Sequence, residues 1–232
     1  MIRASVVIPA AGTGQRFGAA TPKQFLDLAG VPILARTLQA FQHTPCIEHI
    51  VIAASADFHA AITTLCRDYA ITKCSTLALG GSERQHSIYN ALQTSPVQES
   101  EVVLVHDAVR PFVKPEFITQ IVEAANTHGS AVPGLVPKET IKEIETSGRV
   151  RTTHERSRLR AIQTPQGFRR EILTASYDNA RKQGFLGTDD ASVVEFAGNA
   201  VYVIDGAEDN IKITTPLDFA VAEMLLRNAA TQ

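Results

Sequence analysis

The amino-acid sequence predicts an α/β fold with a mostly parallel sheet flanked by helices. Three observations support this prediction. Short apolar runs rich in β-branched residues recur along the chain, as in strands that are buried on both faces. Segments with apolar residues at helical spacing separate these runs, and such alternation favours parallel strands joined by covering helices. Glycine-rich or polar loops follow several runs, at the strand ends where sheets of this kind bind ligands.

The first predicted strand is the run Val6-Val7-Ile8, which suits a strand buried on both faces. Pro32 suits the first position of the helix that follows, because its φ is already helical and its missing N–H would have no partner there. Apolar side chains recur at helical spacing over 33–41. The alternation then continues with a strand at 50–54, a helix at 60–69, a strand at 76–79, a helix through 87–92 and a strand at 102–105.

The second half of the chain interrupts the alternation once. Residues 138–160 hold only four large apolar side chains and a Thr-Ser-Gly turn. An isolated hairpin is marginal in water, so we expect a protruding β-hairpin arm that packs on something beyond its own domain. The other predicted elements are a helix at 117–125, an apolar stretch at 131–136, a helix at 171–182, a second helix capped by 187–190, a strand at 201–204 and an amphipathic helix from Pro216.

The composition is that of an ordinary globular protein, with 44% hydrophobic and 20% charged residues. A net charge of −2 gives no electrostatic footprint for nucleic acid or an anionic membrane. No apolar run is long enough to span a bilayer, and the N-terminus lacks a signal-peptide layout. Cys46, Cys66 and Cys74 form no C-x-x-C pair. We therefore expect reduced thiols and a cytoplasmic protein rather than disulfides or a zinc site.

The loop after the first strand has the properties of a phosphate-binding site. Its small residues, including Gly12 and Gly14, leave backbone N–H groups uncovered, and glycine allows the φ values that turn them inward. A concave row of such donors suits an anion, above all a phosphate. Arg16 and Lys23 follow closely. Two added cations suit a polyphosphate, whereas the structural alternative is a tight turn with surface cations.

Two common nucleotide motifs do not fit this loop. The dinucleotide fingerprint requires glycine where this chain has Phe17, and no acidic residue closes the next predicted strand. No window of the sequence supplies the P-loop pattern G-x-x-x-x-G-K-[ST]. The loop therefore belongs to another class of nucleotide site, if it binds a nucleotide at all.

Charged residues also follow later strands. Asp107 comes directly after the strand at 102–105, where a carboxylate is costly to desolvate unless it is paired or binds a metal. The structural alternative for Asp107 is an acid bonded to turn amides. For His106 we favour a packing or hydrogen-bonding role. Arg84 follows a second glycine turn, and Lys212 stands near the end of the last strand, where its alternative is a surface cation.

Six motifs occur in a fixed order along the chain. They are Pro9-Ala10-Ala11-Gly12-x-Gly14-x-Arg16, Pro22-Lys23-Gln24, Gly80-Gly81-x-Glu83-Arg84, Val105-His106-Asp107-Ala108-x-Arg110-Pro111, Thr164-Pro165-Gln166 and Asp209-Asn210-Ile211-Lys212. Together they resemble the signatures of the 2-C-methyl-D-erythritol 4-phosphate cytidylyltransferase family of the non-mevalonate isoprenoid pathway. The resemblance runs from about Ser5 to the C-terminal helix.

The resemblance implies a Rossmann-like nucleotidyltransferase fold in a single domain, residues 1–232, with 138–160 as a dimerisation arm. It implies the transfer of CMP from CTP to 2-C-methyl-D-erythritol 4-phosphate, which gives 4-diphosphocytidyl-2-C-methyl-D-erythritol and pyrophosphate. It also implies Mg²⁺ or another divalent cation, and a homodimer whose arms complete each other's sites. Nucleic acid and membranes are not expected partners.

The resemblance also implies roles for individual residues. The residues expected to stabilise the negative charge that develops around the α-phosphate are Arg16, Lys23 and Lys212. Those that bind CTP are Ala10, Ala11, Gly12, Gly81, Ser87, Asp107 and Ala108. Those that bind the polyol phosphate are Arg110, Thr140, Arg156, Thr164 and Thr188. The metal candidates are Asp107 and Asp209.

Elementary chemistry agrees with this reading. Phosphoryl-type transfer needs positioning and charge neutralisation rather than a covalent nucleophile, and an attacking phosphate is already ionised. Two alternatives remain. Ribitol 5-phosphate cytidylyltransferase shares the CTP loops and differs only in the arm and in the loops of Thr164 and Thr188. A non-catalytic CTP-binding regulator belongs to another class, but binding alone would not need Lys23, Asp107 and Lys212 together.

Overall fold

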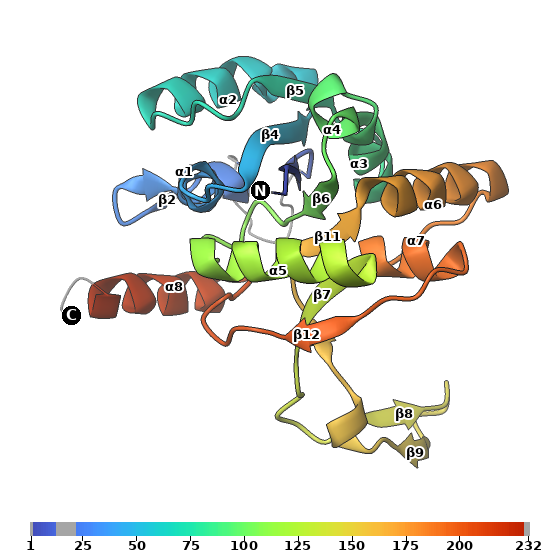
Figure 1. Cartoon of the computed structure of the whole chain (residues 1–232). Coiled ribbons are helices and arrows are strands. Elements are labelled where there is room, and N and C mark those ends of the chain that lie inside the picture. The colour runs from blue at the N-terminus through green and yellow to red at the C-terminus, as the bar shows by residue number, and fades with distance from the viewer. Residues whose placement is uncertain (1, 13–21, 230–232) are drawn as a thin grey trace.

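The computed structural model describes residues 2–12 and 22–229, and it contains a central sheet with helices on both faces (Figure 1). Its eight described strands are ordered β10-β7-β11-β6-β1-β4-β5, with β12 paired to β7. Their bounds are β1 (Ala4–Pro9), β4 (Ile47–Ala54), β5 (Thr76–Leu79), β6 (Val102–Val105), β7 (Ser130–Leu135), β10 (Ala161–Ile162), β11 (Gln166–Arg169) and β12 (Val203–Asp205). The predicted α/β fold is confirmed.

Most neighbouring strands are parallel, as predicted. β1 pairs in parallel with β4 and β6, β4 pairs with β5, and β7 pairs with β12. β11 is the central exception, because it runs antiparallel to both β6 and β7, and β10 runs antiparallel to β7. The sequence did not predict β10 or β11. Both are short, and β11 carries Phe168 as its only large apolar residue.

The order of the strands creates a topological switch point beside β1. From β1 the chain proceeds to β4 and β5 on one side, and it returns on the other side of β1 as β6. Ligands of open α/β sheets bind outside the carboxyl ends of the strands at such a point. The loops that follow β1 and β6 therefore meet where a ligand is expected.

Helices cover both faces of the sheet, as Figure 1 shows. One apolar cluster joins the sheet to α1 (Ile33–Gln42), α2 (Ala56–Asp68) and α5 (Pro115–His128). The second cluster joins the opposite face to α3 (Arg84–Leu92), α4 (Ser95–Gln98), α6 (Arg170–Gln183) and α7 (Asp190–Phe196). Val6 and Ile8 lie in the first cluster and Val7 lies in the second. Strand geometry alternates side chains between faces, and this explains the continuous apolar run of β1.

Smaller elements complete the body of the protein. A third apolar cluster joins α8 (Pro216–Ala229) to the loop after β6 and to the short ladder of β2 (Asp27–Leu28) and β3 (Val31–Pro32). The turn η2 (Lys23–Phe25) precedes this ladder. Asp189 caps α7, because its Oδ1 accepts the Ser192 N–H at 2.9 Å. The cap expected from 187–190 is confirmed.

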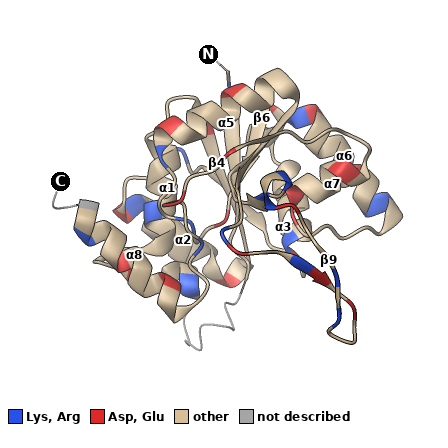
Figure 2. Ribbon diagram, turned by 90° about the horizontal axis from the view of Figure 1, so that it is seen from below, with Lys and Arg blue, Asp and Glu red and all other residues tan. Residues whose placement is uncertain are grey.

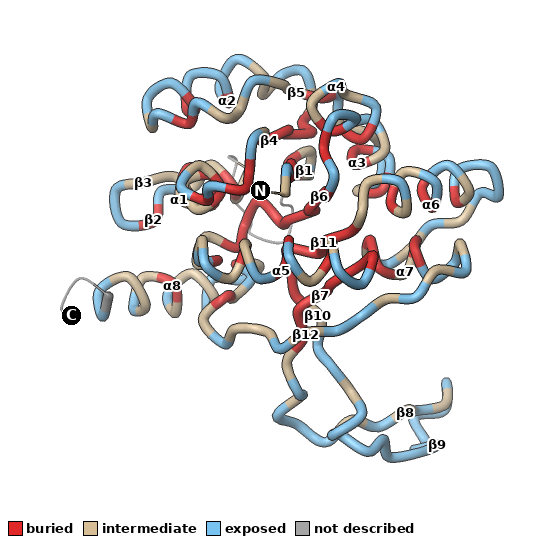
Figure 3. The backbone as a smooth tube through the Cα atoms, in the orientation of Figure 1, coloured by how far each residue is buried: buried red, intermediate tan, exposed pale blue. Residues whose placement is uncertain are grey.

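The predicted hairpin arm is also confirmed. β8 (Lys142–Ile144) and β9 (Val150–Thr153) pair with each other in a separate two-stranded sheet. Figures 1 and 2 show that the hairpin extends away from the body of the protein, and Figure 3 shows that it is mostly exposed. Ile144 is 62% exposed and Val150 47% exposed. The short turn η3 (Arg156–Arg158) leads back toward the main sheet.

Three further expectations can be compared with the structure. The last strand begins two residues later than predicted and extends to Asp205, and it is the partner of β7. The three cysteines are free thiols, as expected. Among the described residues, no helix combines the length and the apolar composition that crossing a bilayer requires.

Candidate active site

A cavity of about 220 Å³ opens at the switch point. Three strand ends supply its walls: the loop after β1, the turn between β5 and α3, and the loop after β6. Its lining residues are Pro9, Ala11, Gly12, Gly81, Ser82, Glu83, Arg84, Ser87 and Asp107. Ala11, Gly12, Gly81, Ser87 and Asp107 are among the residues that the sequence assigned to CTP. Segments far apart in the sequence therefore meet at one end of the sheet.

The start of the glycine loop is held by hydrogen bonds. The Ala10 N–H donates to the Ala53 carbonyl at 2.7 Å. The Gln24 amide donates to the carbonyls of Ala10 at 2.9 Å and Gly12 at 3.3 Å. Gln24 is buried and adjoins Lys23, so it ties the turn that carries this lysine to the loop. Residues 13–21, which include the predicted Gly14 and Arg16, lie outside the described residues.

The second glycine turn forms the opposite wall of the cavity. The Gly81 N–H donates to Ser87 Oγ at 2.9 Å, and Ser87 Oγ donates to the Glu83 carbonyl at 3.2 Å. A side chain at Gly81 would collide with His86, and a Cβ at Gly80 would come within 2.5 Å of Ala11 Cβ. Only glycine lets this turn approach the first loop so closely.

Asp107 is the centre of the charged groups in the cavity. Its Oδ2 lies 3.0 Å from Lys212 Nζ and 3.3 Å from Arg110 Nε, and its Oδ1 lies 3.8 Å from Arg84 Nε. Burial alone would raise the pKa of this carboxyl, but Lys212, Arg84 and Arg110 lower it to about 2. Asp107 is thus ionised throughout the physiological range. The structure confirms that it is a paired acid rather than one bonded only to turn amides.

Arg84 connects Asp107 to a second, fully buried carboxylate. Its guanidinium bonds both oxygens of Asp190, at 3.1 and 2.7 Å, and the Tyr177 hydroxyl donates to the same carboxylate at 2.6 Å. A bidentate pair of this kind fixes the guanidinium in orientation as well as in charge. Sequence reasoning noticed Arg84 but missed Asp190, which lies 106 residues away. No local signal links the two residues.

Lys212 reaches Asp107 because its loop is anchored at Asn210. The Arg110 guanidinium donates to the Asn210 carbonyl at 2.7 Å, and the Asn210 amide donates to the Thr164 carbonyl at 2.8 Å. Burial lowers the pKa of Arg110, and Asp107 opposes that shift. Arg110, Thr164 and Lys212 thus surround Asp107, whereas the sequence placed the first two at the polyol and the third at CTP.

The remaining predicted residues are distributed around this centre. The Ala108 carbonyl, close after Asp107, accepts a hydrogen bond from Thr37 at 3.1 Å. Thr188 is exposed on the loop before α7. Thr140 and Arg156 are exposed on the arm, where Arg156 donates to the Lys138 carbonyl at 2.6 Å. The structure therefore brings Thr164 and Arg110 to Asp107, and it leaves Thr140 and Arg156 on the projecting arm.

The donor set allows one mode of metal binding. Among the described residues, no group of three or more histidine, cysteine or acidic side chains could hold a metal ion. Asp209 Oδ2 pairs with Lys114 Nζ at 2.8 Å. A lone carboxylate such as Asp107 fits Mg²⁺, which proteins commonly hold through one or two carboxylates while substrate phosphates and water supply the other ligands. A metal cage made of protein groups alone does not fit.

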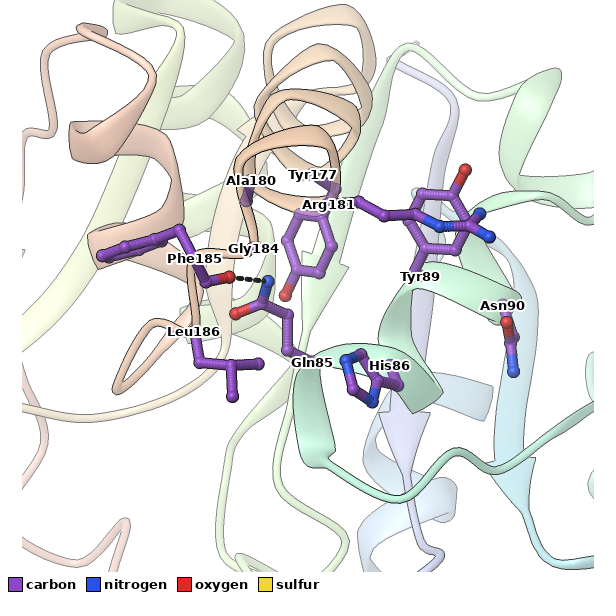
Figure 4. Close-up of a pocket in the computed structure, with 10 residues that line it drawn as sticks. All are labelled: Gln85, His86, Tyr89, Asn90, Tyr177, Ala180, Arg181, Gly184, Phe185 and Leu186. Carbon is purple, nitrogen blue, oxygen red and sulfur yellow. Dashed lines mark hydrogen bonds between the residues drawn. The ribbon is translucent and has the colours of Figure 1, made fainter.

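A larger cavity, of about 410 Å³, lies between α3 and α6 (Figure 4). Its apolar walls include Phe185 and Leu186, and Gln85 crosses it to donate to the Phe185 carbonyl at 2.9 Å. None of the predicted site residues lines it. We place the active site in the smaller cavity, because the convergent charges that phosphate chemistry needs are found there.

Comparison with known proteins gives one consistent family. A family model described as "IspD: 2-C-methyl-D-erythritol 4-phosphate cytidylyltransferase" matches residues 4–228. The protein of that name from Bacillus cytotoxicus is 43% identical to this chain, over 96% of the chain and 97% of the relative. The one from Lysinibacillus sphaericus is 40% identical, over 98% and 97%.

Solved structures give the same result. The crystal structure of 4-diphosphocytidyl-2C-methyl-D-erythritol synthase from Anaerococcus prevotii superposes with a TM-score of 0.84 at 29% identity, covering 97% of this chain and 99% of that one. The 2-C-methyl-D-erythritol 4-phosphate cytidylyltransferase from Thermus thermophilus superposes with a TM-score of 0.77 at 30% identity, covering 95% and 98%. The similarity covers nearly all of this chain.

Proposed function

Because this chain belongs to the 2-C-methyl-D-erythritol 4-phosphate cytidylyltransferase family, we propose that the cavity around Asp107 is its active site. The protein is a cytidylyltransferase that uses CTP to form 4-diphosphocytidyl-2-C-methyl-D-erythritol in isoprenoid synthesis. One observation carries the assignment of the site: Arg84, Arg110 and Lys212 converge on Asp107 at the switch point of the sheet. Such a cationic pocket suits a polyphosphate.

CTP lies, in this proposal, between the two glycine turns. The residues that contact it are Ala10, Ala11, Gly12, Gly81, Ser87, Asp107 and Ala108. The short approach of Gly80 to Ala11 supports this placement, because it brings the two turns together at the cavity. Ser87 Oγ already accepts the Gly81 N–H and donates to the Glu83 carbonyl. It therefore offers the nucleotide only its remaining lone pair.

The chemistry is an in-line displacement at the α-phosphorus of CTP. An oxygen of the polyol phosphate forms the new P–O bond, and the bond to the bridging oxygen breaks as pyrophosphate leaves. No proton has to be removed from the nucleophile, which is already ionised. We assign Arg16, Lys23 and Lys212 to the negative charge that develops on the α-phosphate oxygens. Asp107 holds Lys212 at 3.0 Å and so fixes the direction of its ammonium group.

A divalent cation, Mg²⁺ by preference, belongs to the same proposal. Asp107 would hold it together with the phosphates of CTP, and Asp209, which pairs with Lys114, is the second candidate. When bound, the cation neutralises charge on the triphosphate. The residues of the chain do the rest: Lys23 and Lys212 contact the phosphates, and Arg84 and Arg110 keep the Asp107 carboxylate in place.

The polyol phosphate is assigned to Arg110, Thr164 and Thr188 of one subunit and to Thr140 and Arg156 of the partner arm. The exposure of Ile144 and Val150 supports a dimer, because a hairpin with such side chains uncovered needs a surface to pack on. Closed two-fold symmetry lets two arms clasp reciprocally. We propose a single domain, residues 1–232, in which 138–160 form a dimerisation arm, and a cytoplasmic protein that binds neither nucleic acid nor membranes.

The decisive experiment compares polyol phosphates as acceptors. The purified protein is incubated with CTP, Mg²⁺ and either 2-C-methyl-D-erythritol 4-phosphate or ribitol 5-phosphate, and pyrophosphate release is measured. We expect turnover with the first and at most a trace with the second. The reverse preference would make the protein a ribitol 5-phosphate cytidylyltransferase. Binding of CTP without pyrophosphate release from either acceptor would make it a non-catalytic regulator.

A further inference from the structure

The hydrogen bonds of Thr164 decide what this residue can offer to a substrate. Its Oγ1 accepts the Asp107 backbone N–H at 3.1 Å and lies 3.0 Å from His106 Nδ1. A threonine hydroxyl has one proton and two lone pairs. If the proton points to His106, Thr164 has no donor left for a phosphate oxygen. The protonation of the imidazole therefore sets the specificity of the hydroxyl.

The surroundings of His106 fix that protonation. The ring is fully buried and packs edge-on against Phe41, with 5.0 Å between ring centroids. Its Nε2 lies 3.1 Å from the Arg110 carbonyl oxygen. A carbonyl oxygen only accepts, so Nε2 carries the proton. In a neutral ring Nδ1 is then an acceptor, and the Thr164 hydroxyl must donate to it. The ring is fully buried and its two nitrogens face a carbonyl and a hydroxyl, so no carboxylate among the described residues bonds it to stabilise a second proton, and the ring is neutral.

We propose that His106 is a positioning residue that holds the proton of Thr164, so that Thr164 recognises a hydroxyl group of the polyol rather than its phosphate. The inference rests on the proposed function, which it deepens by dividing the polyol subsite into two parts. Thr164 has one lone pair left, and it can accept only from a donor such as a hydroxyl. The phosphate group of the polyol is then bound by the cationic side chains, such as Arg110 and Arg156.

The same network supports the proposed catalytic cation. Thr164 holds the loop after β6 through the Asp107 N–H, and it holds the loop of Lys212 through its own carbonyl, which accepts the Asn210 amide at 2.8 Å. Asp107 then pairs with Lys212. If the acceptor at His106 Nδ1 were removed, the Thr164 hydroxyl would be free to rotate, and the order of both loops would weaken. His106 thus acts on Lys212 through Thr164 and Asp107.

Variants of His106 test the positioning role. His106→Asn retains an acceptor oxygen near the position of Nδ1, whereas His106→Leu retains only bulk. We expect kcat/KM for 2-C-methyl-D-erythritol 4-phosphate to fall by about 10–100-fold in His106→Leu, the usual range for groups that orient a site. His106→Asn should recover most of that loss. Equal losses in the two variants would show that only packing matters, and would overturn the proposal.

Phe41→Leu is the matched control for lost packing. It trims the ring that contacts His106 and leaves the hydrogen bonds of Thr164 in place. We expect it to lower the melting temperature while kcat/KM per folded molecule stays within about twofold. A loss as large as that of His106→Leu would assign the effect to packing.

Inorganic phosphate is the probe for the specificity of Thr164. Thr164→Val should raise KM for 2-C-methyl-D-erythritol 4-phosphate, but it should leave unchanged the inhibition constant of inorganic phosphate as a competitor of that substrate. If the hydroxyl binds the phosphate group, both constants should rise together, and the proposal fails. Thr164→Ser keeps the hydroxyl and should raise KM for the polyol phosphate much less than Thr164→Val does.

Nitrogen-15 NMR of the histidine rings supplies a readout that does not depend on activity. We expect His106 to show the pattern of a neutral ring protonated at Nε2 at the pH of the activity assay. A ring protonated at Nδ1, or at both nitrogens, would refute the inference even in a fully active enzyme. If the natural protein shows the expected tautomer but does not turn over the substrates, the proposed function is refuted, whereas the hydrogen bonding inferred for His106 stands.

Discussion

At the scale of single residues, the site is defined by cations that gather around buried carboxylates. Arg84, Arg110 and Lys212 face those of Asp107 and Asp190. Glu83 also lines the cavity, so these three cations are balanced by three acids. Lys23 adds a further cation from the turn that Gln24 ties to the glycine loop. The pocket is therefore preorganised for an anionic ligand, and removal of one charge is expected to affect turnover more than folding.

Lys23→Ala is expected to leave the fold intact and to lower kcat by about 10²–10³-fold, the usual cost of losing one preorganised charge-stabilising donor. The lysine stands on a short turn and is only half-buried. Steady-state kinetics and circular dichroism of the purified variant check this. Lys114→Ala is the control, because Lys114 pairs with Asp209 rather than with Asp107. A folded Lys23→Ala variant with near-normal kcat would remove this lysine from the mechanism.

Asp107→Asn is expected to lower Mg²⁺-dependent activity strongly and to raise the Mg²⁺ concentration needed for half-maximal activity, since an amide is a poor ligand for Mg²⁺. It should also lower the free energy of unfolding by about 2–3 kcal/mol, because the pKa of the carboxyl is held near 2, below its usual value. Asp209→Asn is the matched variant. If both residues bind the metal, both variants should need more Mg²⁺ for half-maximal activity. If only Asp107→Asn needs more Mg²⁺, Asp209 is not a metal ligand.

The stability of the protein is expected to depend on pH through His106. Its pKa is about 4 in the folded protein and about 6.5 in the unfolded chain, so the unfolded chain binds more protons between these two values. The free energy of unfolding should therefore fall by about 3 kcal/mol from this group as pH is lowered from 7 to 4. Urea unfolding of the natural protein and of His106→Asn, compared at each pH, isolates the effect. Parallel curves for the two proteins would contradict it.

At the scale of secondary-structure elements, α3 and the arm determine how the site is built. α3 begins at Arg84 and lines the active-site cavity with Arg84 and Ser87, while Gln85 and His86 face the larger cavity beside α6. The helix thus separates the two cavities. The arm, in contrast, extends away from the body (Figure 2), and Thr140 and Arg156 are exposed on it. In the proposed dimer it would complete the site of the other subunit.

Mixing two inactive variants tests whether the arms act across subunits. Lys23→Ala damages the body of the site and Arg156→Ala damages the arm. After subunit exchange, one site of each mixed dimer carries both lesions and the other carries neither, so activity should return. If each arm served its own subunit, both sites of the mixed dimer would stay damaged. A mixture of Lys23→Ala with Lys212→Ala, both in the body, is the control that should stay inactive.

At the scale of the whole molecule, the eight-stranded sheet is a rigid support with its site at one end, and the arm is its most exposed part (Figure 3). The two helical layers bury most side chains of the inner strands, whereas β5, β10 and β12 are partly exposed. Exposed apolar side chains include Ile144 and Val150 on the arm and Leu217 on α8. The proposed dimer would cover the two on the arm.

Replacing both Ile144 and Val150 with glutamate is expected to shift the protein from dimer to monomer and to abolish activity, because the arm loses the apolar surface that docks it. Leu217→Glu, at a residue that is 73% exposed on α8, should leave both properties unchanged. Sedimentation velocity at the concentration of the activity assay measures the shift. A natural protein that sediments as an active monomer would end the proposal of arm exchange.

Local signals in the sequence were sufficient for most elements. β-branched runs defined β1, β4 and β6, apolar spacing defined the main helices, and the cap at 187–190 marked the start of α7. The motifs also located Gly81, Asp107, Thr164 and Lys212 on loops that meet in the structure. These predictions succeeded because hydrophobic periodicity, glycine conformation and helix caps act over a few neighbouring residues.

Only the tertiary structure shows which contacts those loops make with one another and with the sheet. The sequence does not show that Gln166–Arg169 inserts antiparallel between β6 and β7, since four residues carry no readable period. Nor does it show that Arg84 bonds Asp190, or that His106 takes the proton of Thr164 across 58 residues of chain. Such pairs are selected by packing and by the cost of burying an unpaired polar group. That cost becomes specific to a partner only when the fold has brought the two groups together.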